Sequence, residues 1–192
     1  MDFKAMLNRV VRAARLDVSL YSEVEADTSL NREALTVVII VTILAAVGSF
    51  VGSLLLSFEI VPAILGLAWA IIWGIAGYYV WAYLTWFIGT RFFKGTAEPG
   101  ELLRTLGYAY GPRVLGVFAI IPCIGAIPAL IGAIWSLVTG VVAVREALDT
   151  TTGNAVITVA IGWAVILVIS LVVGGIIGVG AVGLGALSGS LQ

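Results

Sequence analysis

The chain is organised around the stretch Leu102–Pro128, LLRTLGYAYGPRVLGVFAIIPCIGAIP. It is apolar enough to enter a bilayer, yet it contains three prolines, four glycines and the basic residues Arg104 and Arg113. Proline costs a helix interior about 3 kcal/mol and glycine about 1 kcal/mol, so helix propensity does not explain this composition. A broken segment is tolerated at membrane depth only where protein or a wet cavity satisfies its freed backbone groups. We therefore expect a short, kinked span that other helices enclose.

The composition of the whole chain places this stretch in a membrane protein. Of the 192 residues, 61% are hydrophobic and 11% are charged, whereas about a quarter of the residues of a soluble domain are charged. The mean hydropathy is +1.14. We expect an all-α integral membrane protein that forms one bundle. The net charge of −1 gives no sign of a nucleic-acid partner.

Apolar runs on both sides of the broken stretch bring the expected number of transmembrane helices to five. The spans cover about 34–56, 62–88, 102–121, 127–144 and 155–177. About 20 apolar residues suffice to cross a bilayer as a helix. We assign residues 29–180 to this membrane domain and 181–192 to a glycine-rich C-terminal tail. Glu33 lies in the first turn of the first span, where the helix dipole favours an acidic residue.

Residues 1–28 are expected to form a cytoplasmic amphipathic segment. Apolar residues recur at helical spacing between positions 3 and 18, and the basic side chains fall on the opposite side. This pattern is typical of a helix that lies in a membrane interface. We expect contacts with the membrane surface from Lys4, Arg9, Arg12 and Arg15. The alternative, a helix packed on the cytoplasmic ends of the bundle, is compatible with it. The polar stretch 22–27 is predicted to be a linker or surface turn.

The positive charges indicate the orientation. All ten Lys and Arg residues lie before the first span, between the second and third spans with their flanks, or between the fourth and fifth spans. Cytoplasmic loops attract positive charge, so the N-terminus is expected inside and the C-terminus outside. The membrane is the cytoplasmic membrane if the source is prokaryotic.

The broken span also carries the candidate functional residues. Pro112 has no N–H to bond the carbonyl of Tyr108, so a kink is expected there. We expect the hydroxyls of Tyr108 and Tyr110 to reach freed carbonyls, and Arg113 to lie near the inner surface, facing a lipid headgroup or a partner. The full motif comprises Gly107, Tyr108, Tyr110, Gly111, Pro112, Arg113, Pro122, Gly125 and Pro128.

Small residues recur every four positions on several spans, which lets neighbouring backbones approach closely. They could serve self-association or packing inside the bundle. This helix-packing set comprises Gly48, Gly52, Gly66, Ala70, Gly74, Gly132, Ser136, Gly140, Gly174 and Gly178.

Several kinds of chemistry find no support in the sequence. There is no histidine and only one cysteine, Cys123, which argues against nucleophilic triads and zinc sites. The first, second, fourth and fifth spans contain no charged residue, which argues against a proton-coupled carrier. We predict no catalytic residue, metal or cofactor. A channel or facilitator for a small neutral solute and an accessory subunit of a larger complex stay open as alternatives.

Short motifs in order suggest a family. Residues 107–112 read GYAYGP, residues 121–125 read IPCIG, and a helix with Trp135 in its middle runs into Arg145–Leu148. This pattern resembles the Yip1 domain family, in its prokaryotic form, over residues 31–177. Eukaryotic members are five-span proteins of early secretory membranes that associate with Rab-type GTPases and with each other. Their Asp-Leu-Tyr-Gly-Pro motif before the first span has no counterpart here, which argues against GTPase binding.

The resemblance implies a non-enzymatic, membrane-organising or partner-scaffolding protein. Its expected partners are the lipid bilayer and either a second copy of the chain or another membrane protein.

Overall fold

The computed structural model describes the backbone of residues 2–189 and the side chains of residues 2–175, and no strand occurs in this range. The all-α fold is therefore confirmed. The elements in order are α1 (Phe3–Ala14), α2 (Val18–Ala26), the 3₁₀ helix η1 (Thr28–Leu30), α3 (Asn31–Ser57), α4 (Ile60–Phe93), α5 (Pro99–Ala109), the 3₁₀ helix η2 (Gly111–Ile120), α6 (Ala126–Ala147) and α7 (Thr152–Gly189).

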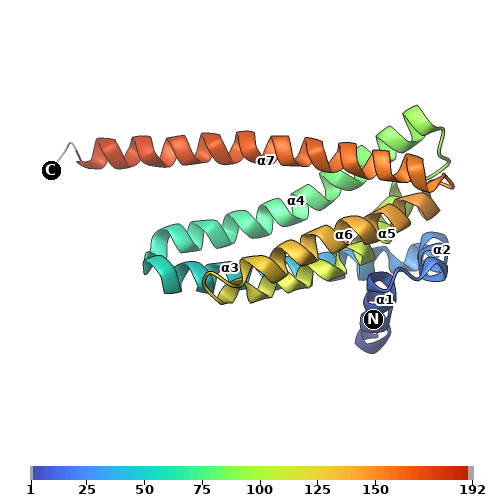
Figure 1. Cartoon of the computed structure of the whole chain (residues 1–192), viewed down its shortest axis with the longest axis horizontal. Helices are drawn as coiled ribbons and strands as arrows, with labels where there is room; N and C mark the ends of the chain where they lie inside the picture. The colour runs from blue at the N-terminus through green and yellow to red at the C-terminus, as the bar shows by residue number, and fades with distance from the viewer. Residues whose placement is uncertain (1, 190–192) are drawn as a thin grey trace.

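Among the described residues, four helices are long and apolar enough to cross a membrane: α3 with η1, α4, α6 and α7. They run along the long axis of the molecule. The C-terminal end of α7 extends beyond the ends of the other helices (Figure 1). The expected third span consists of two shorter pieces, α5 and η2, so the number of five spans remains a prediction. Helix α7 also continues past residue 177 into the stretch expected to be a tail.

The third segment breaks where the sequence predicts it. Helix α5 ends at Ala109, and the chain continues from Gly111 as ten residues of 3₁₀ helix. An α-helix of the same ten residues would rise about 1.5 Å per residue. A 3₁₀ helix rises about 2.0 Å per residue, so η2 spans about 20 Å rather than about 15 Å. Such long 3₁₀ runs are uncommon, and α3 and α6 pack on this one from two sides.

Glycines allow the backbone of η2 to lie directly against these two helices. A Cβ atom added at Gly132 of α6 would lie 2.5 Å from the Pro112 carbonyl oxygen. Added Cβ atoms at Gly48 and Gly52 of α3 would overlap the carbonyls of Val117 and Ala119. These small residues therefore serve packing inside the bundle.

The other members of the helix-packing set differ in their surroundings. Gly74 faces the Thr42 side chain, Gly140 faces Trp81, and Ala70 is half-buried. Gly66 and Gly174 have open space where a Cβ would lie. Gly178 lies outside the residues whose side chains the structure describes. Self-association remains a prediction, and it now rests on the positions with open space.

The N-terminal segment is folded further than expected. Leu16 adopts a left-handed conformation with φ 61°, which ends α1, and a second helix, α2, replaces the predicted linker. The side chain of Asp2 caps α1, and that of Asp17 caps α2. The linker prediction was wrong because Leu20, Tyr21 and Val24, which lie in or beside the polar stretch, are fully buried at helical spacing. Packing outweighs the polar character of the segment.

Candidate functional site

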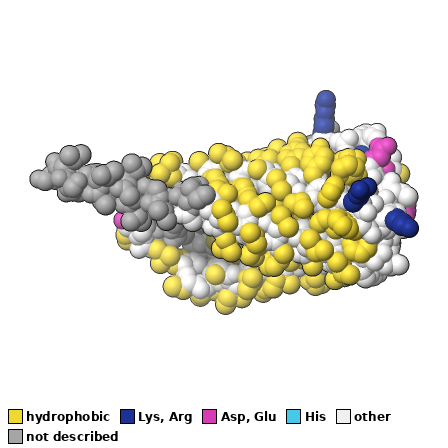
Figure 2. All heavy atoms as spheres, turned by 90° about the horizontal axis from the view of Figure 1, so that it is seen from above, with side chains coloured by type: hydrophobic (Ala, Val, Ile, Leu, Met, Phe, Trp, Pro, Cys, Tyr) yellow, Lys and Arg dark blue, Asp and Glu magenta, His cyan; other side chains and the backbone are white. Residues whose placement is uncertain are grey.

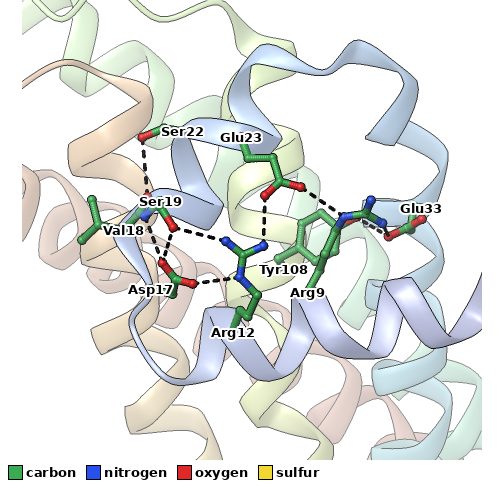
Figure 3. Close-up of polar contacts among 9 residues, drawn as sticks. All are labelled: Arg9, Arg12, Asp17, Val18, Ser19, Ser22, Glu23, Glu33 and Tyr108. Atoms are coloured by element: carbon green, nitrogen blue, oxygen red, sulfur yellow. Dashed lines mark hydrogen bonds and ion pairs between the residues drawn. The ribbon is translucent and has the colours of Figure 1, made fainter.

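A buried polar cluster joins α1, α3 and α5 at the end of the bundle that carries the N-terminal helices (Figures 1 and 3). The Glu33 side chain accepts hydrogen bonds from the Tyr108 hydroxyl and from Arg9 Nη1, both at 2.7 Å. Glu33 is only 7% exposed. The helices come this close because Gly107 packs on Ala34, where an added Cβ would lie 2.8 Å from the Ala34 methyl group. The cluster therefore ties the N-terminal segment to the broken third segment.

The cluster continues along α1 and α2 as a row of alternating charges (Figure 3). Arg12 donates to Asp17 at 2.8 Å, to Glu23 at 3.0 Å and to the Ser19 hydroxyl at 3.2 Å. Glu23 also lies 3.8 Å from Arg9. Hydrogen bonds from Ser19 and then from Arg12 lower the pKa of Asp17 to about 2. These contacts fix the angle between α1 and α2.

Arg104 of α5 binds the C-terminal end of α2. It is buried, and it donates to the carbonyl of Val24 at 3.1 Å, to the carbonyl of Glu25, and to the Asn31 side chain at 3.1 Å. A positive charge at a helix C-terminus is favourable because the last carbonyls have no partner within the helix. Arg104 thus holds α2 against α5.

The basic residues that were predicted to contact the membrane surface fall into two pairs. Lys4 and Arg15 are exposed. Arg9 and Arg12 are less exposed and use their charges in ion pairs within the protein. The structure therefore leaves only Lys4 and Arg15 fully available to an anionic surface, although lipid contacts of all four remain a prediction.

The two motif tyrosines do not serve the freed carbonyls, and this prediction was wrong. Tyr108 donates to Glu33, and Tyr110 donates to the carbonyl of Gly74 at 3.3 Å. The freed carbonyl of Ala109 is instead reached from α6. The hydroxyls of Ser136 and Thr139 both donate to it at 2.9 Å.

The side chain of Arg113 is exposed, and its predicted position near the inner surface remains a prediction. Its guanidinium is stacked 4.5 Å from the centre of the Tyr110 ring. It lines the same cavity as Thr42 of α3 and Gly74 of α4, both of which lie well inside their helices.

The remaining motif residues belong to the other end of the bundle. Pro122 lies in a tight turn in which the Gly125 N–H donates to the Ile121 carbonyl at 2.9 Å, and Pro128 falls in the first turn of α6. The structure thus brings Gly107 to Arg113 together and separates them from Pro122, Gly125 and Pro128.

The roles of four residues in this region could not be recognised from the sequence. Glu33 was assigned only to the helix dipole and Arg104 only to the positive inner side. Both are charges at the edge of apolar stretches, and such positions could have suggested buried partners. Ser136 was assigned to packing, and Thr139 gave no separate signal.

Among the described residues, no group of His, Cys, Asp or Glu side chains could hold a metal ion. Long apolar helices, a broken segment between them and ion pairs gathered at one end define a multi-pass α-helical membrane protein.

The family model of the Yip1 domain matches residues 19–186, and the chain belongs to the Yip1 domain family. Yip1 is not a known enzyme family. Neither the curated proteins nor the solved structures that were compared with the chain gave a significant match.

Proposed function

We propose that this protein is a non-enzymatic, membrane-organising factor that holds an amphipathic helix in the inner leaflet at a fixed depth. The observation that carries this proposal is the placement of α1. The helix crosses the long axis of the bundle (Figure 1). Phe3, Leu7 and Val11 are 65%, 52% and 41% exposed, whereas Met6 and Ala13 are buried against the bundle.

The position of α1 along the bundle supports an interfacial depth. Val10 packs against Gly111, and the indole N–H of Trp135 donates to the Ala14 carbonyl at 2.8 Å. Gly111 follows Gly107 by four residues, and Gly107 packs on Ala34, where the apolar run of α3 begins. Four helical residues correspond to about 6 Å. Interfacial helices bury their apolar faces about 5–10 Å into the headgroup and acyl boundary.

The opposite side of α1 is bonded to the rest of the protein. Arg9 pairs with Glu33, and Arg12 pairs with Asp17 and Glu23. Because these bonds fix the helix to the bundle, its apolar strip enters the lipid as a rigid part of the protein. A rigid helix in one leaflet widens that leaflet, which supports a role in membrane shape and in gathering partners. This role requires the N-terminus to lie inside, as the positive charges indicate.

Site-specific labelling tests this placement. The full chain with Cys123→Ser is reconstituted in vesicles of phosphatidylcholine and phosphatidylglycerol, and an environment-sensitive dye is attached at Leu7→Cys or at Asn8→Cys. Leu7 lies in the exposed apolar strip, whereas its neighbour Asn8 is exposed among polar residues. We expect brominated lipids to quench the dye at position 7 and not at position 8. Equal exposure to water at both positions would contradict the proposal.

Vesicle shape tests the organising role. We expect the wild-type protein to narrow the vesicles, as measured by electron cryomicroscopy. The triple variant Phe3→Glu, Leu7→Glu, Val11→Glu should lose this effect and keep its helical content. Protein-dependent entry of glycerol without a change in shape would instead favour a facilitator for small neutral solutes. Copurification with one stoichiometric membrane partner, again without a change in shape, would favour an accessory subunit.

A further inference from the structure

A groove runs between α3 and α4, beginning next to the turn that joins these two helices. The part beside the turn has a volume of about 260 Å³ and is lined by Ser53, Ser57 and Pro62, among others. The part farther from the turn has a volume of about 270 Å³ and reaches Arg113. Ser49 lines both parts, so the two cavities adjoin as one α3–α4 groove. The turn lies at the end of the bundle opposite the N-terminal helices (Figure 1).

Hydroxyl groups line the α3 side of this groove. Every Ser and Thr of α3 that follows Thr36 in sequence borders it, namely Thr42, Ser49, Ser53 and Ser57. The Thr42 hydroxyl is enclosed, whereas Ser49 and Ser57 are exposed and Ser53 is half-buried. Ser53 and Ser57 donate to backbone carbonyls of α3 at 2.8 Å and 3.0 Å, and a hydroxyl can rotate to another acceptor.

The surroundings of this row of serines are apolar. The visible surface along the middle of the bundle is hydrophobic, and the charged side chains gather mainly at one end (Figure 2). On α3 itself, the large side chains that are exposed outside the groove include Ile43, Val47 and Leu55. The groove is therefore a polar strip between apolar helix faces.

A cation and a pair of aromatic rings border the part of the groove farther from the turn. The exposed side chain of Arg113 belongs to no ion pair among the described residues, and its guanidinium lies over the Tyr110 ring. The rings of Trp69 and Trp73 are stacked with their centres 5.6 Å apart. A guanidinium binds phosphate, and the face of an indole ring attracts an ammonium group. The headgroup of a zwitterionic phospholipid carries both of these groups.

The groove covers most of the thickness of a bilayer. Thr42, which lines it together with Arg113, precedes Ser57 by fifteen residues, or about 22 Å along α3. The hydrocarbon core is about 30 Å thick. Val10 of α1 packs on Gly111, close to the Arg113 end of the groove. The proposed interfacial depth of α1 places this end at the inner headgroups, and this step alone rests on the proposed function.

We propose that the α3–α4 groove lets phospholipids exchange between the two leaflets of the membrane. The headgroup moves along the groove, and the acyl chains stay in the surrounding lipid. A headgroup crosses a bare bilayer slowly because polar groups lose their hydrogen bonds to water in hydrocarbon. Serine hydroxyls replace part of these bonds along the groove, and Arg113 receives the phosphate at one end. The exchange is passive and runs in both directions.

A dithionite assay on proteoliposomes tests the exchange. The full chain is reconstituted in vesicles of phosphatidylcholine and phosphatidylglycerol with a trace of NBD-labelled phosphatidylcholine. Dithionite added outside reduces only the label that lies in the outer leaflet. We expect wild-type vesicles to lose the fluorescence of both leaflets, and protein-free vesicles to lose only that of the outer leaflet.

Variants of the groove identify the route. In the triple variant Ser49→Ala, Ser53→Ala, Ser57→Ala, loss of inner-leaflet fluorescence should slow about tenfold, because the headgroup loses three hydrogen-bond partners and alanine keeps the helix intact. Arg113→Gln should slow the loss about threefold, because it changes only one end of the groove. Thr36→Ala is the matched control, since Thr36 is a hydroxyl residue of α3 that lines neither cavity. It should keep the wild-type rate.

Several results would overturn the proposal. They are inner-leaflet fluorescence that persists in wild-type vesicles, equal rates in wild type and the triple serine variant, and equal slowing in Thr36→Ala. Reduction of trapped NBD-glucose at the same rate as the lipid would show that dithionite enters through a pore, which also overturns it. Failure of the proposed function shows separately, as equal water exposure of the two labels on α1, which this assay does not involve.

Discussion

The two halves of the broken third segment are held in the bundle by different forces. In α5, Arg104 and Tyr108 are buried, and each is hydrogen-bonded to another element. In η2, Arg113 has no ion pair among the described residues, and the backbone packs directly on glycines of α3 and α6. Polar bonds thus stabilise α5, whereas close packing holds η2, beside which cavities lie. The two arginines of this segment therefore differ in burial, because Arg104 is buried among its acceptors and Arg113 is exposed.

The largest difference should appear between the two arginines. Arg104→Gln removes the three hydrogen bonds of a buried guanidinium, so we expect the free energy of unfolding to fall by about 3 kcal/mol. Arg113→Gln should change it by less than about 0.5 kcal/mol. Both variants are unfolded with denaturant in detergent without added lipid. A similar loss in the two variants would remove the distinction between the halves.

The carboxylate that links α5 to α1 should give the next largest effect. Glu33→Gln leaves Arg9 with only the longer ion pair to Glu23. We expect a loss of about 2 kcal/mol, below the range for a fully buried pair because Arg9 is partly exposed. Glu59→Gln is the control, since Glu59 is exposed at the turn between α3 and α4. Limited proteolysis should release the N-terminal segment from Glu33→Gln first. Intact α1 in both variants would show that the cluster does not hold the segment.

The packing of η2 can be tested through two glycines. Gly132→Val places a side chain against the Pro112 carbonyl, which cannot move without shifting η2, so we expect a loss of about 1–2 kcal/mol. Gly66→Val is the matched control, because no atom lies within 4 Å of an added Cβ there. Thermal unfolding followed by circular dichroism measures both variants. Equal unfolding temperatures would mean that η2 has room to move.

The smallest effect concerns pH. Burial, followed by the nearby charges of Glu101, Asp149 and Glu146, raises the pKa of Glu25 to about 7, from its usual value of 4.5. The folded protein therefore binds this proton more readily than the unfolded chain, and stability should rise as the pH falls from about 7 towards 4.5. Glu25→Gln should reduce this rise, measured as the unfolding temperature between pH 5 and pH 8. An unchanged rise would assign it to other groups.

Much of the fold could be predicted from the sequence because bilayer insertion depends on local properties. The long apolar runs around Val37, Trp73, Ser136 and Val159 lie in the four long helices, and Pro112 locates the break. The partners of single polar residues could not be predicted. Glu33 and Tyr108 are 75 residues apart in sequence and meet only through the packing of Gly107 on α3. The register of η2 against α3 likewise depends on a 3₁₀ rise that no local signal specified.

The hydrogen bonds to the Ala109 carbonyl have a consequence for how the chain enters the membrane. Both donors, Ser136 and Thr139, belong to α6, which is synthesised after α5 and η2. An unsatisfied carbonyl in hydrocarbon costs several kcal/mol. The break in the third segment therefore becomes compatible with lipid only when α6 lies beside it. The tight turn at Ile121–Gly125 joins the two closely enough for this. We expect the segment from Pro99 to Ala147 to leave the translocon as one helical hairpin rather than as two successive spans.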